Sequence, residues 1–158
     1  MYTILLSAHS VVRWFILVVF IYTIIRAFYG WIQKKEFGKA DKITLLVTAS
    51  LAHLQLLLGL WLYFVSPLVH FFLNNFHVAV KIKEFRFLGM EHALMMLIAI
   101  IFITIGSSVA KRKKTDIAKF KTIAIWYSLA LVLIVAGIPY RWLDVKWMII
   151  IIDLFFTA

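Results

Sequence analysis

The sequence predicts an all-α integral membrane protein, a four-transmembrane-helix bundle with a short interfacial C-terminal segment. Two observations predict it: the composition, and four long apolar stretches. Of the 158 residues, 65% are hydrophobic and only 15% are charged, whereas a soluble domain is about half apolar and about a quarter charged. A chain of this length suits one membrane domain covering residues 1–158.

Four apolar stretches are long enough to cross a bilayer, whose hydrocarbon core of about 30 Å needs roughly 20 helical residues. The first carries Arg13 in its interior. The second follows Asp41, a suitable N-cap, and the third carries Glu91 and His92 near its start. Pro139 closes the fourth. Backbone amides in hydrocarbon must pair within their own segment, so each stretch is expected to be a helix. The predicted spans are about 3–28, 43–65, 87–110 and 122–138.

Two further segments are apolar but do not qualify as spans. Residues 67–86 mix apolar side chains with Asn74, Asn75 and His77. They are expected to form either an amphipathic helix in the outer interface or an extension of the second helix. The tail from Trp147 to Phe156 is about half a span long and contains Asp153, which predicts an interfacial or packing segment.

Basic residues predict the orientation. Cytoplasmic connections are enriched in Lys and Arg, and ten basic residues lie in the first and third connections against three in the second. This predicts that the N- and C-termini lie outside the cytoplasm. In a bacterium, the membrane would be the plasma (inner) membrane. The net charge of +10 is then explained by topology and anionic lipids rather than by nucleic acid. The ten are Lys34, Lys35, Lys39, Lys42, Lys111, Arg112, Lys113, Lys114, Lys119 and Lys121.

The chain contains no cysteine. This excludes disulfides, thiolate metal sites, iron–sulfur ligation and covalent c-type haem attachment. Any metal must be held by His, Met, carboxylate or backbone groups.

Three histidines lie inside predicted spans, where polar side chains are costly and suggest function. At about 1.5 Å per residue, His9 lies roughly 9 Å below the outer end of the first helix, and His92 roughly 8 Å below that of the third. The two therefore match in height. His53 lies near mid-bilayer, with no polar side chain one turn away on its own helix.

Height-matched imidazoles on facing helices are the arrangement that holds a b-type haem in a bundle core. His9 and His92 are the predicted axial pair for the haem iron, with His53 as an alternative ligand or a supporting residue. Three intramembrane histidines allow at most one bis-histidine haem. Arg13, one turn deeper than His9, has two candidate partners: a haem propionate, or Glu91 across the bundle.

Several of these positions lie in short stretches that resemble one group of proteins. Residues 8–14 (AHSVVRW), 52–59 (AHLQLLLG) and 91–97 (EHALMML), with the closing Pro139, resemble small four-span bacterial membrane proteins labelled cytochrome b-like. The resemblance covers nearly all of residues 1–140. It implies haem ligation by membrane histidines, with His9, His53 and His92 at the matching positions.

Three functions are compatible with the sequence. The favoured one is a haem b-binding electron-transfer protein, or a subunit of a redox complex, that exchanges electrons with a membrane partner or a quinone. The second is a non-catalytic accessory subunit of a larger complex. The third is a small transporter or ion pathway that uses His53, Glu91 and Arg13. No residue is assigned a catalytic role, and a carrier or subunit is favoured over a stand-alone enzyme.

Overall fold

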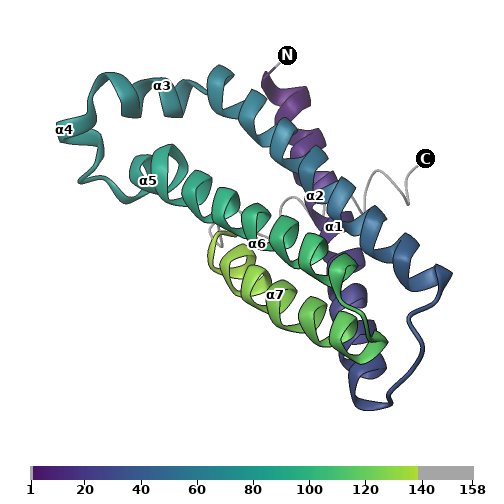
Figure 1. Cartoon of the computed structure of the whole chain (residues 1–158). Coiled ribbons are helices and arrows are strands. Elements are labelled where there is room, and N and C mark those ends of the chain that lie inside the picture. The colour runs from purple at the N-terminus through teal and green to yellow at the C-terminus, as the bar shows by residue number, and fades with distance from the viewer. Residues whose placement is uncertain (1, 139–158) are drawn as a thin grey trace.

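A computed structural model describes residues 2–138, and every regular element in that part of the chain is a helix (Figure 1). The prediction of an all-α membrane bundle is confirmed, because four of the segments are long and apolar enough to cross a bilayer. In chain order the elements are α1 (Tyr2–Ile32), α2 (Lys39–Val65), α3 (Pro67–Asn74), α4 (Phe76–Ala79), α5 (Lys83–Arg86), the π-helical turn η1 (Phe87–Glu91), α6 (His92–Arg112) and α7 (Asp116–Ala136).

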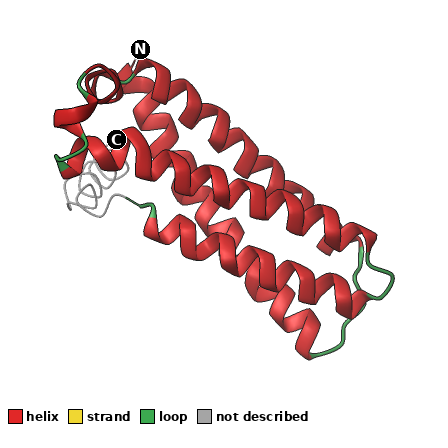
Figure 2. Cartoon of the chain, turned by 60° about the vertical axis from the view of Figure 1, so that its left-hand side comes forward, coloured by secondary structure: helices red, strands yellow, loops and turns green. Residues whose placement is uncertain are grey.

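The four long helical segments form a ring in which α1 packs against α2 and α7, and α6 packs against the same two helices. Helices α1 and α6 therefore stand diagonally across the bundle, whose long helices lie side by side (Figure 2). At most 33% of the residues in each apolar window are buried, so most of the apolar surface faces outward. Such a surface is stable in lipid and not in water.

Aromatic stacking and interhelical hydrogen bonds hold the middle of the bundle. The ring of Phe20 on α1 stacks on Tyr127 of α7 at 5.0 Å between centroids. The Tyr127 hydroxyl hydrogen-bonds the hydroxyl of Ser107 on α6 at 2.9 Å, and Thr23 of α1 bonds Thr48 of α2 at 2.7 Å. Hydroxyl pairs of this kind join transmembrane helices because lipid offers no competing partner.

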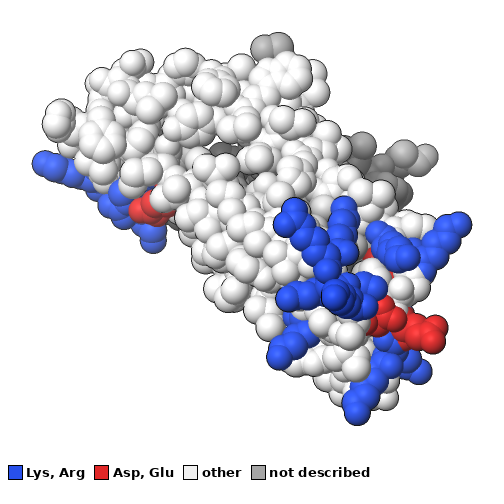
Figure 3. Space-filling view, viewed as in Figure 1, with Lys and Arg blue, Asp and Glu red and all other residues white. Residues whose placement is uncertain are grey.

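Lysine and arginine side chains gather at one end of the bundle, which we call the basic end (Figure 3). It carries the α1–α2 and α6–α7 connections, at residues 33–38 and 113–115. A two-point ion pair joins the helices there: Arg26 donates from Nε and Nη2 to the carboxylate of Asp41, at 2.7 and 3.3 Å. Asp41 is not the N-cap predicted from the sequence: Gly38 occupies that position, and α2 begins at Lys39. Asp41, at the third position of the helix, accepts the backbone N–H of Gly38 at 3.0 Å.

The structure corrects one expectation for residues 67–86. Helix α2 ends at Val65, and the next residue, Ser66, has an extended backbone (φ −77°, ψ 121°), so this segment is not a continuation of the second helix. It folds into the short helices α3, α4 and α5 at the end of the bundle opposite the basic end (Figure 1). Its interfacial placement stays a prediction. The predictions for Pro139 and for the tail from Trp147 to Phe156 lie outside the described residues.

Candidate functional site

The structure brings together the two histidines that the sequence analysis paired. The imidazole centroids of His9 on α1 and His92 on α6 lie 6.5 Å apart, and the ring planes are inclined at 74°. They reach each other from diagonally opposed helices, so the pair lies across the interior of the bundle. The predicted match in height is therefore confirmed.

A π-helical turn precedes His92 and sets its direction. The turn η1 covers Phe87–Glu91 and inserts a wider turn before α6, a distortion that is rare and often found at functional sites. Its Gly89 is buried against the ring of Phe72, where a Cβ atom would collide. The hydroxyl of Tyr63 on α2 donates to the Gly89 carbonyl oxygen at 2.8 Å and fixes the turn to the neighbouring helix.

The ring of His92 is held in one tautomer. Its Nδ1 lies 2.7 Å from the carbonyl oxygen of Gly137, and a carbonyl can only accept, so Nδ1 carries the proton. The lone pair of a neutral ring is then on Nε2, which makes no hydrogen bond among the described residues. Histidine ligands of metals are commonly oriented in this way, through the ring N–H that faces away from the metal.

His9 is fixed mainly from its backbone side. The side-chain amide of Gln55 on α2 donates from Nε2 to the His9 carbonyl oxygen at 2.9 Å. One turn further along α2, Gly59 leaves room for the imidazole: a Cβ atom there would lie 3.2 Å from Cε1 of His9. The Nδ1 atom of His9 is buried and has no hydrogen-bond partner among the described residues.

Two more buried polar atoms beside His9 lack a partner in the described part of the chain, Nε of Arg13 and Oε1 of Gln55. Buried polar groups are almost always hydrogen-bonded. Among the described residues, three such exceptions therefore lie around His9. The guanidinium of Arg13 contacts the ring face of Trp14, 5.3 Å from its centroid, and keeps its hydrogen-bonding capacity on Nε.

The predicted pairing of Arg13 with Glu91 is wrong. Glu91 does not pair with Arg13 across the bundle; its carboxylate accepts from Nε of Arg86 at 2.6 Å. Arg86 lies five residues earlier on the same continuous helical segment, and it also donates to the carbonyl oxygen of Val80. A local partner needs no helix to be displaced, and it leaves Arg13 available to another acceptor.

His53 is placed differently from the other two. Its Nδ1 lies 2.7 Å from the carbonyl oxygen of Ala49, and its Nε2 lies 3.1 Å from the hydroxyl of Thr104 on α6. The neutral ring donates from Nδ1 to Ala49, and its Nε2 faces the Thr104 hydroxyl, which donates to the carbonyl oxygen of Ile100 at 2.7 Å. The His53 side chain is exposed. His53 also precedes Gly59 by six residues, about 9 Å along α2. It does not join the His9–His92 site.

Gln55, Gly59 and Tyr63 are not among the site residues predicted from the sequence. An amide inside an apolar span was the available signal for Gln55. The other two could not be found without the fold, because glycine and interfacial tyrosine are common in membrane helices.

Two imidazoles restrict what the site can bind. A zinc ion held by protein alone takes three or four ligands, and no group of three or more His, Cys, Asp or Glu suited to a metal ion occurs among the described residues. A haem iron needs only two axial ligands, since the porphyrin supplies the other nitrogens. Comparison with protein-family models, curated proteins and solved structures found no match to this chain.

Proposed function

We propose that this protein is a haem b-binding membrane electron-transfer protein in which His9 and His92 are the two axial ligands. The observation that carries the proposal is the 6.5 Å separation of their ring centroids. Metal–imidazole bonds are about 2.0–2.1 Å long, and a ring nitrogen is about 1 Å from its centroid. Two imidazoles on opposite sides of one iron therefore have centroids about 6 Å apart, close to the separation found here.

The polar atoms around the pair also suit a haem. A haem carries two propionates, and an arginine guanidinium is the side chain best matched to a carboxylate. Arg13 has an unpaired Nε on the same helix face as His9. The bound haem would supply one-electron chemistry. The chain would hold it by His9 and His92, neutralise a propionate through Arg13, and exclude water with the apolar side chains of the bundle.

The transporter alternative loses its support from the polar residues. His53 is exposed and has Ala49 and Thr104 as neighbours of its two ring nitrogens, and Glu91 is paired with Arg86. The protein that we propose is instead a carrier or redox subunit in a bacterial plasma membrane, with both termini outside and with a quinone or a membrane redox protein as its electron partner.

Absorption spectroscopy tests the proposal. Protein purified after expression with ample haem is expected to show a Soret band, and a sharpened α band on reduction. Replacing either axial ligand, His9→Ala or His92→Ala, is expected to remove the low-spin reduced spectrum. His53→Ala is the matched control and is expected to keep it.

A wild-type protein that folds, remains monodisperse and shows no Soret band would refute the haem assignment. It would favour the accessory-subunit alternative. Loss of the spectrum in His53→Ala, with retention in His92→Ala, would refute the choice of ligands while leaving a haem protein.

A further inference from the structure

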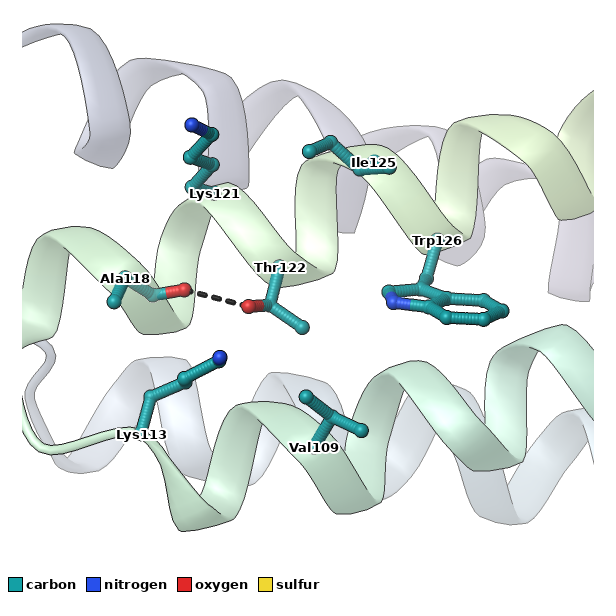
Figure 4. A pocket seen from close by; sticks show the side chains of 7 residues that line it. All are labelled: Val109, Lys113, Ala118, Lys121, Thr122, Ile125 and Trp126. Carbon is teal, nitrogen blue, oxygen red and sulfur yellow. Dashed lines mark hydrogen bonds between the residues drawn. The ribbon is translucent and has the colours of Figure 1, made fainter.

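A second site lies far from the histidines, in a groove between α6 and α7 at the basic end (Figure 4). Its volume is about 300 Å³, at the small end of the range for ligand pockets. It is open on one side and runs along α7 over about 12 Å, the length of eight helical residues. The lining residues are Val109, Lys113, Ala118, Lys121, Thr122, Ile125 and Trp126.

The groove has a cationic mouth and an apolar floor. In Figure 4 the ammonium of Lys113 extends from the end of α6 toward α7, while the indole of Trp126 lies deeper between the two helices. Val109 and Ile125 complete the apolar part. The Trp126 ring is fixed by its contact with Phe102, at 5.6 Å between centroids. An amphiphile with a negative head group fits this order of side chains.

No acidic side chain among residues 2–138 forms a salt bridge with Lys113, the charge at the mouth. The nearest acid in sequence, Asp116, is bound to Lys119 at 2.7 Å and accepts a hydrogen bond from the backbone of Phe37 in the α1–α2 connection. Asp116 therefore has its partners on α7 and in the α1–α2 connection, and not at Lys113.

The other polar side chains that line the groove have partners within the chain. The Nζ atom of Lys121 lies over the ring of Trp31 on α1, 5.5 Å from its centroid, so its hydrocarbon stem is the part that lines the groove. The hydroxyl of Thr122 donates to the carbonyl oxygen of Ala118. Lys113 is thus the side chain that would meet a ligand's charge.

We propose that this groove binds one anionic phospholipid, with its phosphate at Lys113 and the upper part of one acyl chain against Val109, Ile125 and Trp126. Basic pockets between transmembrane helices are suited to anionic head groups. A free phosphate ion would have no use for the apolar floor, whereas a membrane lipid matches both halves. This inference does not depend on the haem proposal.

The test uses the full chain in phosphatidylcholine vesicles that contain a minor fraction of brominated lipid, either phosphatidylglycerol or phosphatidylcholine. Bromine on an acyl chain quenches a tryptophan that it contacts, and Trp126→Phe identifies the groove component. The anionic lipid is expected to quench this component at about fivefold lower mole fraction than the zwitterionic lipid, the effect of one lysine near an anionic surface.

Two variants address the two halves of the groove. Lys113→Gln is expected to abolish the anionic preference, and Ala118→Leu to weaken quenching by both lipids, because its side chain fills the groove. Lys114→Gln removes the same charge one residue away, outside the lining, and is expected to behave as wild type.

Equal quenching by the two lipids, or equal effects of Lys113→Gln and Lys114→Gln, would overturn the proposal. Inorganic phosphate added to the vesicles distinguishes the two sources of the same anion. No effect on quenching supports the lipid, whereas displacement of the anionic lipid would show that the site takes soluble phosphate and would overturn the lipid assignment.

Discussion

The Nδ1 atom of His92 lies 2.7 Å from the carbonyl oxygen of Gly137, which joins the start of α6 to the end of α7. Gly137 is the C-cap of α7, and the last carbonyls of a helix have no partner within it. One hydrogen bond therefore satisfies a helix end and fixes the tautomer of the imidazole. The orientation of His92 thus depends on a residue 45 positions away.

Gly59 has no side chain and so leaves space for the imidazole of His9. Gly59→Ala is expected to keep haem binding, because its Cβ would lie 3.2 Å from Cε1 of His9 and a shift of a few tenths of an ångström relieves the contact. Gly59→Leu displaces the ring and is expected to lower haem affinity at least about tenfold, as changes around metal ligands do. The measurement is the Soret absorbance per protein during haem titration. Leu60→Phe, on the lipid-exposed face, is the control and should bind normally.

Arg13 is expected to raise the reduction potential of a haem held at His9, because its positive charge disfavours the ferric state. Arg13→Gln should lower the midpoint potential. A charge about 10 Å away at an effective dielectric constant of about 20 contributes about 1.7 kcal/mol, or about 70 mV. Potentiometric titration of the purified protein measures it. Arg112→Gln, at the basic end, is the control; an equal change in both variants would contradict a local role for Arg13.

The Arg26–Asp41 pair is expected to stabilise the contact between α1 and α2. Asp41→Asn leaves the Arg26 guanidinium without its counter-charge. The Asp41 side chain is only 5% exposed, so the lost contact is a buried one. Breaking a buried pair costs about 3–5 kcal/mol, and the partial exposure of Arg26 reduces the expected loss to about 2 kcal/mol. Unfolding in mixed detergent measures the free-energy difference. Glu36→Gln changes an exposed carboxylate in the same connection and should unfold as wild type does; equal stability of Asp41→Asn would argue against the pair.

The orientation can be tested directly because the chain contains no cysteine. In intact cells, Asn75→Cys is expected to react with a membrane-impermeant maleimide. Lys114→Cys, at the basic end, should react only after permeabilisation. The prediction rests on the excess of Lys and Arg in the α1–α2 and α6–α7 connections. The reverse labelling pattern would place the termini in the cytoplasm.

The sequence specified the bundle because the bilayer sets simple requirements. Apolar length and internal backbone pairing together predict helices, and the structure places them at Tyr2–Ile32, Lys39–Val65, Lys83–Arg112 and Asp116–Ala136. The constant rise per residue along those helices was also enough to predict that His9 and His92 lie at a similar height. Distance along the helix axis can be read from residue number alone.

The rotation of each helix about its axis, and the partner of each polar side chain, could not be predicted from residue number. The sequence slightly favoured Glu91 over a haem propionate as the partner of Arg13, but the structure joins Glu91 to Arg86. The structure also places the ring nitrogens of His53 beside Thr104 and a carbonyl of its own helix. The π-helical turn before His92 is likewise invisible to a regular helical count. The sequence by itself determined how many helices are long and apolar enough to cross a membrane and how far along them the histidines lie, because these follow from length and hydrophobicity. The tertiary structure decided which side chains meet, because that depends on how the helices are rotated and packed against one another.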